Sequence, residues 1–160
     1  VVSAAAGNAA IPIYVINLER SPHRWEQMSE QLSKCHLSAS RLDAVDGGTL
    51  SPTELAESCT PLATKLLPRG VIGCFLSHRR FWGEVMLRKH ECAVVLEDDT
   101  QLTPDFDARL PQILASLPEE WDVCLLGALG CAHPSGILGE GPLNQVMAAY
   151  VGGVRKCRRA

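Results

Sequence analysis

Three consecutive acidic residues, Glu97, Asp98 and Asp99, directly follow an apolar run in the segment AVVLEDDTQL. Adjacent carboxylates repel one another unless a cation or several hydrogen-bond donors neutralise them. Carboxylate oxygens suit Mg²⁺ or Mn²⁺, which proteins often share with phosphate groups. Glu97 and Asp99 are two residues apart, so in an extended segment they share a side and could form an acid-x-acid metal site. Solvated acids that cap the following turn have the same pattern, so the triplet alone leaves both interpretations open.

The residues around the triplet alternate between predicted strands and helices. Short apolar runs predict strands at 11–18, 92–96 and 121–127, and a less apolar segment predicts another at 38–45. The run before the acids is apolar throughout, which is typical of a strand covered on both faces. The alternation indicates an α/β fold with a largely parallel sheet. In such folds ligands bind beyond the carboxyl ends of the strands, and the acids follow such an end.

Helix starts lie between these strands. Ser21 followed by proline, the capping box from Ser51 to Glu54, and Thr103 followed by proline each predict a helix start. A longer helix follows a loop at 68–70. Its apolar side chains are predicted to face inward: Phe75, Leu76, Trp82, Val85 and Met86.

Length and composition limit the classes of function. The 160 residues suit one domain, and a net charge of −3 with a pI of about 5.9 argues against a nucleic-acid partner. No apolar run is long enough for a transmembrane segment, and peripheral membrane contact is left open. Residues 1–10 lack the basic and long apolar regions of a signal peptide. Only the tail at 154–160 is basic.

The seven cysteines include no C-x-x-C pair, which excludes a zinc ribbon and a thioredoxin motif. Cys74, Cys92 and Cys124 lie in apolar runs, and we interpret them as buried free thiols. One or two disulfides remain open as an alternative.

Several common catalytic motifs are missing. The chain has no P-loop, no G-x-G-x-x-G after the first strand and no G-x-S-x-G elbow. An α/β domain with an acidic metal motif and no glycine cradle fits a nucleotide-sugar transferase, in which a metal carries the diphosphate. An unrelated metal-dependent phosphotransferase is a remote alternative.

Three blocks occur in one order: IYVINLERSPHR, GVIGCFLSHRRFW and AVVLEDDT, with weaker blocks AVDGG and WDVCLLG. Together they resemble glycosyltransferase family 25, which contains bacterial lipooligosaccharide galactosyltransferases and animal procollagen galactosyltransferases. The resemblance covers about 11–127. It implies a GT-A-like, Rossmann-like fold with a mixed, mostly parallel sheet and flanking helices. It also implies a UDP-sugar donor, most often UDP-galactose, a Mn²⁺ or Mg²⁺ ion, and inversion at the anomeric carbon.

The resemblance also implies roles for individual residues. Glu97 and Asp99 match the metal motif. The resemblance does not identify the general base, for which Asp122 and Asp46 are the two candidates. The donor-binding positions are Asn17, Leu18, Arg24, Asp46, Gly47, Ser77, His78 and Asp98.

Each of these positions also has an ordinary structural interpretation. The guanidinium of Arg24 suits a diphosphate, although most arginines are simply solvated. Asp46 and Gly47 also fit a common turn, and a histidine such as His78 is more often packed than a ligand. Gly73 is expected to allow a close backbone approach, and Trp82 is expected in the core.

The predicted organisation is a flexible segment at 1–10, a nucleotide-sugar-binding domain at 11–127, and a divergent or incomplete segment at 128–160. A family block resembling GTHAY is reduced there to Ala149 and Tyr150. Two hypotheses follow: a transferase acting on a glycan or protein-hydroxyl acceptor, or a truncated, non-catalytic nucleotide-sugar-binding or interaction domain. A bacterial enzyme would be cytoplasmic and peripheral to the membrane, and a eukaryotic one would lie in the secretory lumen.

Overall fold

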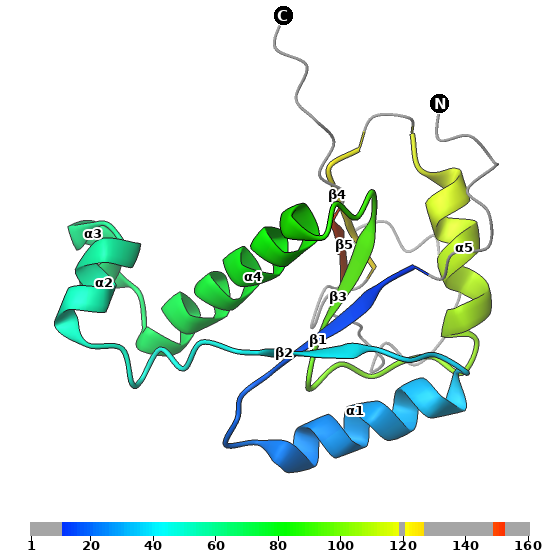
Figure 1. The fold of residues 1–160 in the computed structure, drawn as a ribbon, viewed down its shortest axis with the longest axis horizontal. Helices are drawn as coiled ribbons and strands as arrows, with labels where there is room; N and C mark the ends of the chain where they lie inside the picture. Colours follow the sequence, from blue (N-terminus) through cyan, green and yellow to red (C-terminus); the bar gives the residue numbers. More distant parts are fainter. Residues whose placement is uncertain (1–10, 119–120, 127–148, 153–160) are drawn as a thin grey trace, which may run out of the picture.

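The structure, a computed structural model, describes residues 11–118, 121–126 and 149–152 (Figure 1). The predicted segments 1–10 and, for the most part, 128–160 therefore lie outside the described residues. In chain order the elements are β1 (Ile13–Asn17), α1 (Pro22–Lys34), β2 (Ser40–Asp43), α2 (Pro52–Ser58), α3 (Pro61–Leu66), α4 (Arg69–Leu87), β3 (Ala93–Glu97), α5 (Phe106–Ser116), β4 (Val123–Leu125) and β5 (Ala149–Gly152).

The strands form one sheet in the order β2-β1-β3-β5-β4. β1 pairs in parallel with both β2 and β3, whereas β5 pairs antiparallel with β3 and with β4. Four of the five strands therefore point the same way. The predicted α/β fold with a mixed, mostly parallel sheet and flanking helices is confirmed, and it agrees with a Rossmann-like GT-A arrangement.

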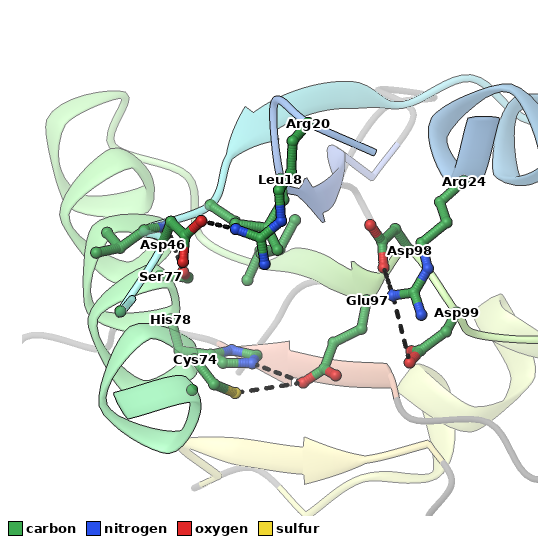
Figure 2. A pocket seen from close by; sticks show the side chains of 15 residues that line it. Leu18, Arg20, Arg24, Asp46, Cys74, Ser77, His78, Glu97, Asp98 and Asp99 are labelled. Carbon is green, nitrogen blue, oxygen red and sulfur yellow. Dashed lines mark hydrogen bonds and ion pairs between the residues drawn. The ribbon is translucent and has the colours of Figure 1, made fainter. Parts of the chain in front are cut away.

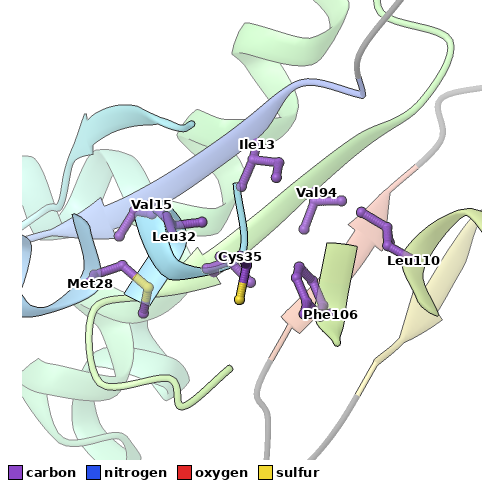
Figure 3. Close-up of a cluster of buried hydrophobic side chains, with 9 residues drawn as sticks. Ile13, Val15, Met28, Leu32, Cys35, Val94, Phe106 and Leu110 are labelled. Carbon is purple, nitrogen blue, oxygen red and sulfur yellow. The ribbon is translucent and has the colours of Figure 1, made fainter. Parts of the chain in front are cut away.

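Both faces of the two central strands are buried, because alternate side chains of β1 and β3 point to opposite faces of the sheet. On one face they pack with α1 and α5 (Figure 3), in a cluster of Ile13, Val15, Met28, Leu32, Cys35, Val94, Leu96, Phe106 and Leu110. On the other face they pack with α4, in a cluster of Tyr14, Ile16, Phe81, Val85, Ala93 and Val95. The two layers of helices fix the ends of β1 and β3 in place.

The face of α4 that packs on the sheet differs from the predicted one. Leu76 and Val85 are buried as predicted, but Phe75, Trp82 and Met86 are exposed, and the prediction for these three is wrong. The apolar side chains of α4 are spread around most of its circumference, so their spacing alone does not predict which face of the helix packs on the sheet.

The buried aromatic residue of α4 is instead Phe81, which is fully buried and contacts Tyr14 edge to face at 5.6 Å between ring centroids.

The cysteines are also less buried than predicted. Cys74 is exposed and Cys92 and Cys124 are partly exposed, so the expectation of three buried thiols is wrong. Among the described cysteines Cys35 is the buried one, and it lies at the C-terminal end of α1 in the first core cluster.

The capping box at Ser51 is present, with Glu54 N–H donating to the serine hydroxyl and the Ser51 N–H donating to the Glu54 carboxylate. The short helix α3 was not predicted. Among the described helices, none is long and apolar enough to cross a membrane.

Candidate functional site

A pocket lies at the carboxyl ends of β1 and β3, with α4 along one side (Figure 2). Nine of the eleven predicted site residues line it: Leu18, Arg24, Asp46, Gly47, Ser77, His78, Glu97, Asp98 and Asp99. Parallel strands bring their carboxyl ends to one edge of a sheet, so residues more than 70 positions apart meet there. The placement is that of a ligand site. The role of each residue within it stays a prediction.

The central acid of the triplet, Asp98, is neutralised by side chains of the protein. One of its oxygens, Oδ2, accepts a hydrogen bond from Asn17 Nδ2 at 2.6 Å, and the other, Oδ1, accepts one from Arg24 at 2.9 Å. Asn17 is fully buried and also donates to the Ser21 carbonyl at 3.0 Å. Asn17 thus ties the end of β1 to the end of β3, behind the pocket rather than in its lining.

Arg24 reaches the pocket from the first turn of α1. Its Nη1 lies 2.9 Å from Asp98 and 3.9 Å from Asp99, and its side chain is 44% exposed. Asp98 therefore holds the guanidinium at the pocket wall while part of the group faces solvent. A group held in this way can pair with a phosphate.

Glu97 turns toward α4 instead of toward Arg24. Its Oε1 lies 3.1 Å from His78 Nε2 and 3.8 Å from the Cys74 sulfur. The hydrogen bond from His78 is the main cause that lowers the pKa of Glu97, against the opposing effect of burial. Burial, and then the charge of Glu97, raise the pKa of the Cys74 thiol.

Cys74 was not among the predicted site residues. The pattern that could have revealed it is its spacing of four residues from His78, which places both side chains on one face of a helix.

The loop that carries Asp46 is pressed against α4. The Val45 N–H donates to the Ser77 hydroxyl at 2.8 Å, and that hydroxyl donates to the Gly73 carbonyl at 2.7 Å. A Cβ on Gly73 would lie 2.5 Å from the Val45 carbonyl oxygen, and one on Gly47 would lie 1.8 Å from the Arg69 carbonyl oxygen. The close backbone approach predicted for Gly73 is confirmed, and buried Ser77 holds the pocket wall.

Asp46 itself forms an ion pair with Arg20 and accepts a hydrogen bond from the Gly48 N–H at 3.0 Å. Asp122 lies far from it. Asp122 is exposed and immediately precedes Val123, the first residue of β4. Val123 and Ala93 both pair with Gly152, so Val123 lies level with the amino end of β3. Asp122 therefore lies at the opposite end of the sheet from Glu97, where it does not line the pocket.

The donor chemistry of the pocket fits a hard divalent cation. Glu97 and Asp99 both line the pocket with carboxylates, and Asp99 is 60% exposed. Both oxygens of Asp98 are already engaged, so the two outer acids are the ones that could bind Mn²⁺ or Mg²⁺.

Comparison with known proteins finds one matching family model and several similar proteins. A family model described as Glycosyltransferase family 25 (LPS biosynthesis protein) matches residues 10–134. A Bos taurus protein named "Probable inactive glycosyltransferase 25 family member 3" is 34% identical over 149 residues, which is 86% of this chain and 25% of that protein. Procollagen galactosyltransferase 1-A of Xenopus laevis is 33% identical over 130 residues, 72% of this chain and 21% of that protein.

Procollagen galactosyltransferase 2 of Homo sapiens is 30% identical over 126 residues, which cover 72% of this chain and 20% of the human protein. The chain thus spans between a fifth and a quarter of the length of these curated relatives. These relatives include proteins named as galactosyltransferases and a protein named as probably inactive.

Proposed function

Because the chain belongs to glycosyltransferase family 25, we propose that it binds a UDP-sugar together with Mn²⁺ or Mg²⁺ and transfers the sugar, galactose, to a hydroxyl of a glycan or a protein. The observation that carries the proposal is the pocket, in which Arg24 and the carboxylates of Glu97 and Asp99 meet at the carboxyl ends of β1 and β3. Two relatives named procollagen galactosyltransferases support the choice of sugar.

In this proposal different residues of the pocket contact different parts of the UDP-sugar. Arg24 pairs with the diphosphate, since Asp98 already orients its guanidinium. The segment at 45–47, fixed by Ser77, forms the wall against which the nucleotide lies. Glu97 and Asp99 would hold the cation, which would supply positive charge to stabilise the departing diphosphate.

The transfer is a single displacement with inversion. The acceptor oxygen forms a bond to the anomeric carbon as the bond from that carbon to the diphosphate oxygen breaks on the opposite side. The acceptor proton goes to a carboxylate acting as general base. Among the described residues, Asp46 is the one pocket carboxylate outside the acidic triplet, and it would have to exchange its contact with Arg20 to act in this way.

That engagement of Asp46 favours a second candidate function, donor binding without transfer. With Asp46 paired to Arg20 and Asp122 at the far end of the sheet, neither predicted base is ready to accept a proton. The bovine relative, which matches a larger share of this chain than the two galactosyltransferases, is named as probably inactive. The pocket would then hold the nucleotide-sugar for a role in recognition.

Calorimetric titration of UDP and UDP-galactose, with and without Mn²⁺, tests donor binding. We expect Mn²⁺ to strengthen binding, and Asp99→Asn to weaken the Mn²⁺-dependent binding by at least about tenfold, or ~1.4 kcal/mol. Glu57→Gln, an exposed change on α2 outside the pocket, is the matched control and should bind as the unaltered chain does. Absent binding, or binding that ignores the metal, would overturn both candidate functions.

An assay of UDP-galactose turnover then separates the two candidates. Release of UDP that depends on Mn²⁺ and on an added hydroxyl acceptor supports the transferase. Tight donor binding with no release of UDP supports the binding domain.

A further inference from the structure

A second set of ligand atoms shares this pocket but differs in its chemistry from the acidic triplet. Cys74 and His78 project from one face of α4, and Glu97 reaches them from the end of β3 (Figure 2). The sulfur, an imidazole nitrogen and a carboxylate oxygen all lie within 4.8 Å of one another. Among the residues that the structure describes, this is the one group of three potential metal ligands whose atoms lie within that distance of one another.

Two of the three separations between these atoms are close to those of ligands around one small ion, and the third is within 4.8 Å. Zinc binds sulfur at about 2.3 Å and nitrogen or oxygen at about 2.0–2.2 Å, so ligand atoms in a tetrahedral site lie about 3.3–3.7 Å apart. The observed separations from the Glu97 oxygen are 3.1 Å to the His78 nitrogen and 3.8 Å to the Cys74 sulfur. Shifts of a few tenths of an ångström would bring them to those values.

The mixture of ligand types selects among metals. A thiolate and an imidazole beside one carboxylate are typical of Zn²⁺, whereas Mg²⁺ prefers oxygen ligands throughout. Three protein ligands leave a fourth position, and all three residues line the pocket, so this position faces it. An ion has access, because Cys74 is exposed and Glu97 is one-third exposed.

The backbone holds the ligands in place before an ion arrives. Ser77, between the two helical ligands in sequence, is buried and bonded to Val45, and Gly73 packs against the same loop. Phe81 anchors the next turn of α4 in the core. Glu97 ends a strand whose other residues are fully buried. Ligands on rigid elements lose little conformational entropy on binding.

We propose that Cys74, His78 and Glu97 form a zinc site whose fourth position is open to the pocket. Zinc binding needs neither a nucleotide nor an acceptor, but it shares Glu97 with the Mn²⁺ or Mg²⁺ site of the proposed function. With zinc bound, Asp99 is the carboxylate of the triplet that remains for the cation of the donor. The zinc site also gives a reason for the orientation of Glu97, whose carboxylate turns toward α4 while Asp98 and Asp99 lie near Arg24.

Metal titration of the chelator-stripped chain tests this assignment. Zn²⁺ affinity is measured by competition with a chromogenic chelator, and Co²⁺ is used as a spectroscopic substitute that shows a thiolate-to-cobalt charge-transfer band in the near ultraviolet. We expect one tight equivalent of Zn²⁺ and that band in the unaltered chain.

Cys74→Ser should abolish the band and weaken Zn²⁺ binding more than about 100-fold, because loss of even an outer partner of a zinc ligand costs 10–100-fold. His78→Ala should weaken binding similarly. Cys59→Ser and the double change Cys131→Ser with Cys157→Ser remove thiols elsewhere in the chain and should leave both readouts unchanged. Circular dichroism checks that each variant is folded.

The proposal is overturned if the folded Cys74→Ser variant binds Zn²⁺ as the unaltered chain does, or if the charge-transfer band is absent from the unaltered chain. It is also overturned if the double change at Cys131 and Cys157 removes the band. Because zinc is read directly, these outcomes do not depend on whether UDP-galactose binds.

Discussion

The close approach between α4 and the loop at 45–47 makes a sharp prediction about two glycines of one helix. Gly73 faces that loop, and a Cβ there would lie 2.5 Å from the Val45 oxygen, 2.6 Å from the Gly47 nitrogen and 3.1 Å from the Gly47 Cα. All three atoms belong to the backbone, so no side chain can rotate to make room. A Cβ on Gly83, ten residues further along α4, would have no neighbouring atom within 4 Å.

The magnitudes follow from two opposing effects. Replacing a helical glycine with alanine stabilises the helix by up to about 1 kcal/mol, because the backbone of the unfolded chain loses freedom. Overpacking costs typically about 1–3 kcal/mol, and contacts this short with backbone belong to the upper end. Gly73→Ala should therefore lower the free energy of unfolding by ~1–2 kcal/mol, whereas Gly83→Ala should raise it by ~0.5–1 kcal/mol.

Urea unfolding followed by tryptophan fluorescence and by circular dichroism measures both variants against the unaltered chain. The difference between the two variants should be about 2 kcal/mol, which is well above the error of linear extrapolation. Equal free energies of unfolding for the two variants, or a Gly73→Ala variant that is the more stable, would show that the loop does not lie against the helix as described.

Three further predictions concern the core, a thiol and the proposed donor site. Phe81→Ala should lower the free energy of unfolding by about 3–5 kcal/mol in urea, and Phe75→Ala, at an exposed position of the same helix, by no more than about 0.5 kcal/mol; similar losses would mean that the wrong face of α4 is assigned. Burial raises the pKa of Cys92 from 9.0 to about 11, so between these pH values the Cys92 thiol binds its proton more strongly in the folded chain than in the unfolded chain. Stability should therefore fall as the pH rises from about 9 to 11, and an unfolding series in Cys92→Ala with the same fall would refute the cause. Arg24→Lys should weaken UDP binding at least about tenfold, as a point charge replaces a planar fork, with Glu26→Gln on the same helix as an unaffected control in the same titration.

The position of the pocket could be predicted from the sequence because it depends on strands rather than on side-chain contacts. Two clear apolar runs became β1 and β3, and parallel strands align their carboxyl ends. Residues that follow those ends, such as Leu18 and Glu97, therefore lie together in the pocket. The family blocks added the turn at Gly47, which lines the opposite wall.

The orientation of the side chains could not be predicted, because it depends on packing between distant elements. Apolar residues at both Phe81 and Trp82 made the rotation of α4 ambiguous, and the sheet selects Phe81. The same rotation moves Cys74 from its expected burial to the exposed side, next to Glu97. The hydrogen bonds that hold the Asp98 carboxylate come from Asn17 in β1 and Arg24 in α1, more than 70 residues earlier.

The order of strands in the sheet has a consequence for how the protein is made. β5 (Ala149–Gly152) lies between β3 and β4, so the last described strand to leave the ribosome enters the interior of the sheet and not its edge. Until then β3 has a bare edge, and β4, which bonds to the sheet through β5, has no place to dock. Bare strand edges recruit other chains. The edge of β3 is therefore open to aggregation until β5 pairs with it, and a holding chaperone would help most in that interval.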